Sequence, residues 1–150
     1  MREGTFQYTI QARCTPERAM RTVAELDRHR ELHPLIVAVR AVPPAPGALR
    51  GWLITDRLAC GPFRFPITYR VDLLSRDDHQ LVMVARQRPA TTVRNHTTVT
   101  PEPDGLVRID VTITLAAPTP LFGYAFRQAR AAHLILATRT RAALEAEPSE

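Results

Sequence analysis

The sequence contains no lysine, few glycines and only two cysteines. All 20 basic residues are arginine, and none of the 6 glycines is grouped with others as a phosphate-binding loop requires. Cys14 and Cys60 stand far apart, in neither a metal-binding nor a redox spacing. No apolar run approaches the ~20 residues needed to cross a bilayer. We therefore expect no nucleotide-binding loop and no integral membrane association.

The formal charge of +5 raises the question of nucleic-acid binding. The arginines are scattered along the chain, and no segment combines basic and aromatic residues as RNA-binding motifs do. We therefore predict no nucleic-acid partner. The first residues lead directly into a strand-like alternation, so we expect no signal peptide and a cytoplasmic location.

Length and composition favour one globular domain. A chain of 150 residues is long enough for one domain with a real core and barely enough for two. Its apolar fraction of 45% and charged fraction of 23% argue against disorder. We expect the domain to cover 1–147 and residues 148–150 to form a disordered tail.

The longest predicted element is a helix over 119–147. Pro118 and Pro120 suit a helix start, and Pro148 marks its end. A helix of this length runs roughly 40 Å and is not stable without a surface against which to bury its apolar side. That side is a stripe of mainly apolar residues, namely Phe122, Phe126, Ala129, His133, Leu136, Ala137, Thr140 and Leu144.

The rest of the chain predicts a sheet that supplies this surface. Residues 5–13 alternate between apolar and polar, and Thr15 with Pro16 then marks the start of a helix. The segment 27–32 is either the end of that helix or a second short helix, stopped by Pro34. Turn-forming residues separate the further expected strands at 36–42, 51–60, 63–74, 79–88, 91–100 and 106–115.

Clean alternation in three strands indicates an antiparallel sheet with one covered and one solvated face. The odd positions of 63–73, from Phe63 to Leu73, and of 107–115 are apolar or aromatic and form the covered set. No second sheet is available, so helices must provide the cover, chiefly the last one. The fold class is therefore α+β.

Three segments are informative beyond the order of the elements, namely Thr15-Pro16-Glu17-Arg18-Ala19, Asp27 through His33-Pro34-Leu35-Ile36, and the helix after Pro118-Thr119-Pro120. With these segments the order of elements resembles the helix-grip arrangement of the START-like superfamily, often labelled SRPBCC, including its polyketide cyclase/dehydrase members. The resemblance covers essentially the whole chain. It implies a seven-stranded curved sheet wrapped around the C-terminal helix, with one or two short helices after the first strand and an apolar cavity between sheet and helix.

His133 and Asn95 are the first candidate site residues. His133 lies near the middle of the apolar helix stripe, where it is either a hydrogen-bonded core histidine or a polar anchor of a cavity. Asn95 shares the inward parity of Val93 and Thr97, unless a bulge turns Arg94 and its neighbours inward instead. With Asn95 inward, Arg94 is free to pair across strands with a residue such as Asp110.

Tyr69 and Asp56 are further candidates. Tyr69 belongs to the covered set and is either a core aromatic or a cavity hydroxyl. Asp56 has ambiguous parity: it is either a solvent-facing partner of Arg57 or Arg70, or a buried carboxyl with a raised pKa. His133, Tyr69 and Asp56 form our candidate catalytic set, and our candidate ligand-binding set is Trp52, Phe65, Asn95, Phe122, Phe126, Ala129, His133, Leu136 and Thr140.

No metal or other cofactor is predicted. His29 and His33 are spaced as two ligands on one helix face, but Pro34 follows immediately and no third ligand is suggested. The segment instead fits the polar end of a helix.

Three functions remain open. The first is binding of a hydrophobic or aromatic small molecule, of the polyketide, lipid or quinone class, between sheet and C-terminal helix. The second, suggested by the resemblance, is a polyketide cyclase, aromatase or dehydratase that uses acid/base groups of the cavity. The third is protein–protein binding through the back of the last helix, so both a monomer and a homodimer are possible.

Overall fold

The computed structural model describes residues 1–60 and 62–146. The predicted tail at 148–150 lies outside the described residues. The chain starts with strand β1 (Arg2–Arg13), followed by helix α1 (Pro16–Ala24), the 3₁₀ turn η1 (Leu26–Arg28) and the short helix α2 (His29–Leu32). The Thr15 side chain accepts a hydrogen bond from the Arg18 backbone N–H, which confirms the predicted cap. Because η1 separates α1 from α2, the segment 27–32 contains a second short helix and is not the end of the first one.

Seven strands form one antiparallel sheet in the order β1-β7-β6-β5-β4-β3-β2. After α2 the chain forms β2 (Ile36–Val42), β3 (Arg50–Cys60), β4 (Phe63–Arg76), β5 (Gln80–Gln87), β6 (Thr91–Pro101), the 3₁₀ turn η2 (Pro103–Gly105) and β7 (Leu106–Ala117). All strands predicted from the alternation are present. β1 extends back to Arg2 because it pairs with β7 along its whole length, as far as Ala117.

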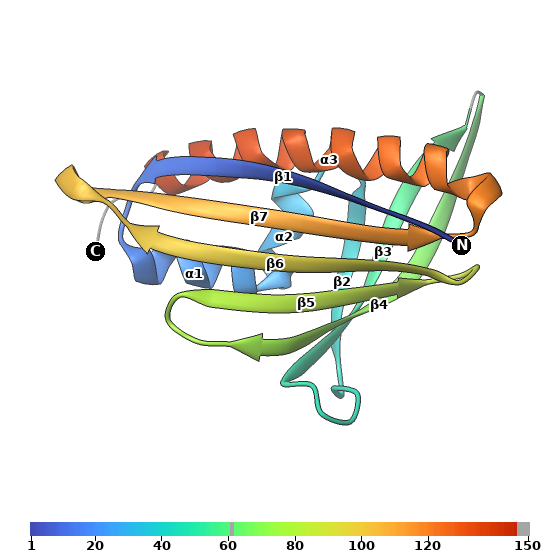
Figure 1. Ribbon diagram of the computed structural model, residues 1–150, viewed down its shortest axis with the longest axis horizontal. Helices are drawn as coiled ribbons and strands as arrows, with labels where there is room; N and C mark the ends of the chain where they lie inside the picture. The colour runs from blue at the N-terminus through green and yellow to red at the C-terminus, as the bar shows by residue number, and fades with distance from the viewer. Residues whose placement is uncertain (61, 147–150) are drawn as a thin grey trace.

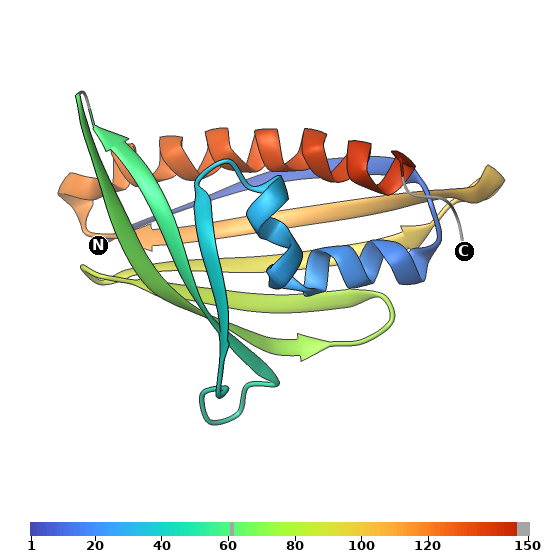
Figure 2. The same cartoon turned by 180° about the vertical axis from the view of Figure 1, so that it is seen from behind.

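Helix α3 (Thr119–Ala146) lies along the concave face of this sheet. β1 and β7 run beside α3, whereas β2 and β3 cross its direction steeply, so the sheet curves around the interior (Figures 1 and 2). α1 and α2 lie on the same side of the sheet as α3 (Figure 2). This arrangement confirms the predicted α+β helix-grip fold.

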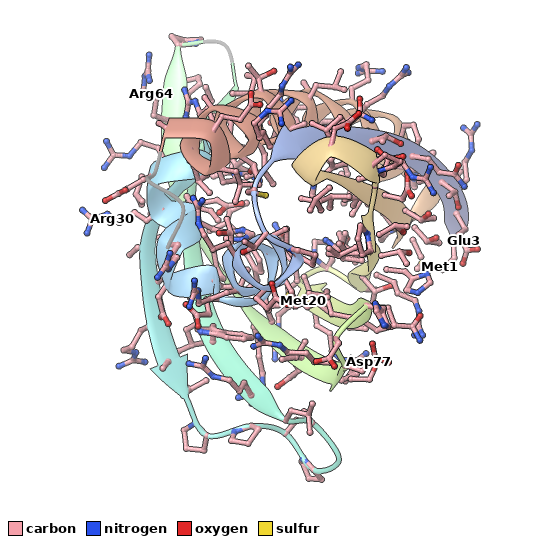
Figure 3. All side chains as sticks on the ribbon, turned by 90° about the vertical axis from the view of Figure 1, so that its left-hand side faces the viewer. Met1, Glu3, Met20, Arg30, Arg64 and Asp77 are labelled. Atoms are coloured by element: carbon pink, nitrogen blue, oxygen red, sulfur yellow. The ribbon has the colours of Figure 1, made fainter. Side chains whose placement is uncertain are left out.

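The core lies between the concave face and the helices. Ile109 and Ile113 of β7 are completely buried, and the side chain of Leu144 on α3 is only 1% exposed. Burying side chains of this size contributes about 1.5–3 kcal/mol each to the free energy of folding. The charged groups labelled in Figure 3, such as Arg30, Arg64 and Asp77, point away from this interior.

A glycine lets α3 pack close to β1. A Cβ atom at Gly4 would lie 2.6 Å from Cζ of Phe122 and 3.1 Å from Cε2 of Phe126. The rings of Phe122 and Phe126 therefore occupy the space that a side chain on this strand would take. They tie the first turns of α3 to the edge of the sheet.

Two predictions about side-chain placement are wrong. Phe63 was assigned to the covered set, but it is 71% exposed, because the β3–β4 hairpin extends past α3 (Figure 2) and no other described element covers its end. Arg94 does not pair with Asp110, because the register places Arg94 opposite Thr114. Asp110 instead binds Arg108 and accepts a hydrogen bond from Thr9. No helix in the described part of the chain is both long and apolar enough to span a membrane.

Candidate functional site

A cavity of about 330 Å³ lies between the concave face of the sheet and α3. Small side chains on the inner face of α3 leave this space open, since Ala125, Ala129 and Ala132 end at Cβ. Most of the wall is apolar, with a few polar groups at separate places, as is typical of small-molecule sites. The apolar part of the lining consists mainly of Val23, Leu26, Leu35, Ile36, Ile54, Leu58, Phe65, Ile67, Val71, Met83, Val93, Ile113, Leu115, Leu121 and Leu136.

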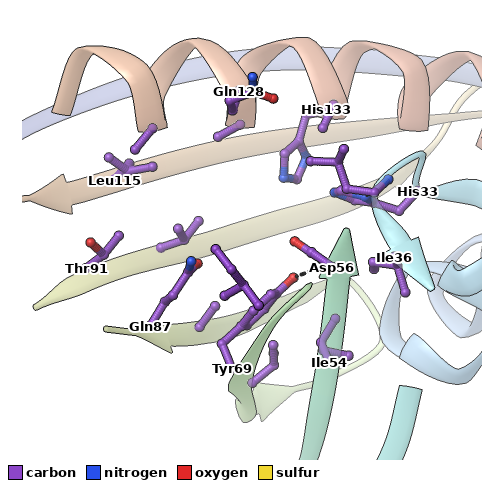
Figure 4. Close-up of a pocket in the computed structure, with 18 of the residues that line it drawn as sticks. His33, Ile36, Ile54, Asp56, Tyr69, Gln87, Thr91, Leu115, Gln128 and His133 are labelled. Carbon is purple, nitrogen blue, oxygen red and sulfur yellow. Dashed lines mark hydrogen bonds between the residues drawn. The ribbon is translucent and has the colours of Figure 1, made fainter. Parts of the chain in front are cut away.

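Asp56 and Tyr69 form a hydrogen-bonded pair in the wall of the cavity (Figure 4). The Tyr69 hydroxyl donates to Oδ1 of Asp56 over 3.1 Å, between the neighbouring strands β4 and β3. Burial raises the pKa of Asp56 from 3.8 to about 6, although the hydrogen bond from Tyr69 opposes this shift. Burial and the nearby carboxylate also raise the pKa of Tyr69. Asp56 can therefore exchange a proton near neutral pH, while Tyr69 stays a hydrogen-bond donor.

The alternative reading of Asp56 as a solvent-facing ion-pair partner is wrong. The pleat of β3 places Asp56 on the same face as Ile54 and Leu58, toward the cavity. Arg70 binds Asp72, on its own strand, over 2.9 Å.

His133 projects from α3 into the cavity (Figure 4). Its Nδ1 lies 2.7 Å from the hydroxyl oxygen of Tyr8 on β1. The pKa of His133 is lowered to about 3, chiefly by burial, and the neighbouring His33 and His29 lower it further. The imidazole is therefore neutral at physiological pH.

His33 enters the same end of the cavity from the segment between α2 and β2 (Figure 4). Its ring centroid lies 5.9 Å from that of His133, with the two planes at 85°. The backbone N–H of Leu35 donates to Nδ1 of His33 over 3.2 Å. Burial, with a smaller contribution from His29, lowers the pKa of His33 to about 4, so this ring is also neutral.

Asn95 also lines the cavity, and its side-chain oxygen accepts a hydrogen bond of 2.6 Å from the Thr97 hydroxyl. β6 has no bulge at this point, so the inward alternative is the one observed. Of the candidate residues, the cavity brings together Asp56, Phe65, Tyr69, Asn95, Ala129, His133 and Leu136.

Four candidate ligand-binding residues lie outside the cavity lining. Trp52 is completely buried, with the Arg50 guanidinium 4.9 Å from the centre of its ring. Phe122 and Phe126 pack on each other and against β1. Thr140 is buried farther along α3.

Sequence reasoning missed several groups at the site. His29, His33, Gln87, Arg88 and Gln128 line the cavity, and Tyr8 supports His133 from behind. Tyr8 lies in the alternating segment 5–13, but its contact with His133 joins residues 125 positions apart, which no local pattern predicts. No three His, Cys, Asp or Glu side chains in the described chain are grouped as metal ligands.

The fold matches several solved structures at low sequence identity. The di-domain ARO/CYC StfQ from the steffimycin biosynthetic pathway superimposes with a TM-score of 0.74 at 15% identity. The match covers 93% of this chain but only 50% of StfQ, so the chain spans half of that protein.

Two further structures match over nearly their whole length. A START superfamily protein from Mycobacterium smegmatis gives a TM-score of 0.73 at 10% identity, covering 93% of this chain and 96% of that one. The Zhui aromatase/cyclase from Streptomyces sp. R1128 gives 0.65 at 10% identity, covering 99% and 100%. At such identities the likeness establishes the START-like fold alone.

No curated protein matches the sequence. The sequence does match one family profile, described as polyketide cyclase/dehydrase and lipid transport, over residues 3–146. This match covers nearly all of the chain and agrees with the seven-stranded sheet and the helix it grips. The chain therefore belongs to the polyketide cyclase/dehydrase and lipid transport family.

Proposed function

We propose that this protein binds a hydrophobic or aromatic small molecule, of the polyketide, lipid or quinone class, in the cavity beneath α3. The single observation that carries this proposal is the cavity of about 330 Å³ with its mainly apolar wall and few polar groups. Apolar surface transferred from water into such a cavity gives the affinity, and the separate polar groups orient the ligand. The family and its structural neighbours support the same class of ligand.

Filling the cavity tests this proposal. Ala129→Phe places a ring in the space that we assign to the ligand, whereas Ala131→Phe adds the same ring to the exposed side of α3. Binding is measured as the rise in melting temperature with a panel of naphthols, naphthoquinones and fatty acids. We expect the wild type and Ala131→Phe to be stabilised by the same compounds and Ala129→Phe by none. Equal stabilisation of all three proteins would refute binding in this cavity.

A second candidate function is acid/base catalysis of ring closure or dehydration on a polyketide-like chain. The observation that favours it is Asp56, a carboxyl group in an apolar cavity with a pKa of about 6. In this role Asp56 takes the proton from a carbon between two carbonyl groups, and Tyr69 holds the carboxylate in position. His133 lines the same cavity and is available as a hydrogen-bond donor.

Turnover of a poly-β-ketone separates the two functions. We expect Asp56→Asn to lower the rate of aromatic product formation by about 10²- to 10⁴-fold while the binding of naphthols is retained. Tyr69→Phe should retain a larger share of the rate, because the carboxyl group is still present. If Asp56→Asn and wild type show the same rate above the uncatalysed reaction, Asp56 is not the base.

A further inference from the structure

Two imidazole rings, those of His33 and His133, lie close together at one end of the cavity. His33 and His133 come from segments 100 positions apart, and both line the cavity. Their rings lie next to each other, nearly perpendicular and with centroids 5.9 Å apart (Figure 4). Which nitrogen of each ring carries the proton decides what the pair can bind.

The proton of His33 is on Nε2. The backbone N–H of Leu35 can only donate, so Nδ1 of His33 must offer its lone pair. A neutral imidazole with an unprotonated Nδ1 carries its single proton on Nε2. The ring is neutral because its burial lowers its pKa to about 4.

The proton of His133 is also on Nε2. If Nδ1 carried it, the Tyr8 hydroxyl would accept, and its own proton would need another acceptor in a buried place. Within the described chain the Tyr8 hydroxyl has only the bond to His133. Tyr8 therefore donates to Nδ1, and the neutral ring keeps its proton on Nε2.

Both Nε2–H donors lack a partner among the described residues. His29, the third ring in the wall, differs because its Nε2 donates to the backbone oxygen of Thr22. Two neutral donors that face one cavity suit an acceptor with two lone pairs, such as an oxygen atom. A ketone oxygen fits this requirement, because an sp² oxygen accepts two hydrogen bonds from different directions.

Building on the proposed ligand cavity, we propose that His33 and His133 form a two-donor site that binds a carbonyl oxygen of the ligand. The site selects ketones over hydrocarbons of the same shape. It lies in the same cavity as Asp56 (Figure 4), so a bound ketone would have its acidic α-carbon within a cavity that also holds a proton acceptor. The substrate class is thus a ketone with a hydrophobic body, since most of the cavity wall is apolar.

A fluorescent ketone and its hydrocarbon counterpart test the site. The probes are 6-propionyl-2-(dimethylamino)naphthalene, whose emission moves to longer wavelength when its carbonyl accepts hydrogen bonds, and 6-propyl-2-(dimethylamino)naphthalene, which lacks the carbonyl. His33→Asn and His133→Asn are suitable variants, because the Asn oxygen replaces Nδ1 as an acceptor while the Nε2–H donor is lost. His96→Asn on the exposed side of β6 is the matched control.

We expect each cavity variant to weaken ketone binding about 3- to 10-fold and to move the bound emission to shorter wavelength. The affinity for the hydrocarbon should stay the same in all proteins, and His96→Asn should behave as wild type. Should His133→Asn not fold, Tyr8→Phe replaces it, because releasing Nδ1 lets the proton leave Nε2 and weakens ketone binding alone.

Two results overturn the proposal, and they differ in meaning. If both probes bind but the ketone affinity and emission are the same in every variant, the two-donor site is refuted and the ligand cavity stands. If neither probe binds to the wild type, the proposed ligand cavity is refuted for this class of compound, and the donor site with it.

Discussion

Asp56 makes the stability of this protein depend on pH in a way that one substitution can isolate. Its carboxyl group has a pKa of about 6 in the folded protein, raised from 3.8 chiefly by burial. Between these two values the unfolded chain releases a proton that the folded protein retains. The contribution of Asp56 is therefore most favourable below pH 4 and is lost as the pH rises to 6.

The size of this loss follows from the shift in pKa. A difference of about 2 units corresponds to ~3 kcal/mol, and partial access of water to the cavity reduces this to about 1–3 kcal/mol. Asp56→Asn removes the ionisation while keeping the shape of the side chain. Relative to wild type, the variant should gain about 1–3 kcal/mol in the free energy of unfolding between pH 4 and pH 7.

Urea unfolding of both proteins at several pH values measures this difference. Wild type and variant must be compared at each pH, because His33 and His133 change the stability of both proteins in the opposite direction. Their lowered pKa values cost stability as the pH falls below about 6.5. Both histidines are present in wild type and variant, so their contribution cancels. A stability difference that is constant from pH 4 to pH 7 would show that Asp56 has an ordinary pKa and is not buried in the cavity wall.

Two further substitutions test the packing of α3. Leu144→Ala should lower the free energy of unfolding by about 2–5 kcal/mol, because the Leu144 side chain is 1% exposed. Leu134 lies on the same helix but is 52% exposed, so Leu134→Ala should change the free energy of unfolding by less than ~0.5 kcal/mol. Equal effects in thermal unfolding would mean that the helix does not present the Leu144 side to the sheet. Gly4→Ala should cost about 1–3 kcal/mol in urea unfolding, because the new Cβ would meet the Phe122 ring. No loss there would show that α3 does not lie this close to β1.

The alternation of single residues was enough to predict the sheet. β7 shows why: Ile109 and Ile113 alternate with polar residues, and each proved to face the concave side. Such a pattern depends only on the two-residue repeat of a strand, so it holds wherever one face is covered. The same local logic identified Tyr69 as inward-facing and placed His133 on the inner side of the helix. For Asn95 it left a bulge as the alternative, which the register of β6 excludes.

Inward parity does not distinguish a packed core from a cavity wall. Trp52 and Phe65 lie on the inner faces of adjacent strands, yet Trp52 is completely buried and Phe65 lines the cavity. The difference depends on what lies opposite each side chain. Phe63 is left exposed by the described residues, because the hairpin extends beyond α3 (Figure 2).

The sequence could not predict the contact between His33 and His133 either, because it too depends on what lies opposite each side chain. Around His33 the sequence shows a polar helix end before Pro34, which fits an exposed turn equally well. Only the return of that segment beneath α3 buries the ring and places it 5.9 Å from His133. Tyr8 and Asp56 likewise acquire their roles from neighbours on other elements.

The amino-acid sequence by itself determined the order of the elements, the inner face of the cleanly alternating strands and the presence of one long helix that must pack on a sheet. These properties follow from repeats of two and 3.6 residues and from prolines at helix ends, all of them local. The tertiary structure alone decided where the interior stays open and which polar groups meet there. Both depend on distances between residues far apart in the chain, which no local pattern encodes.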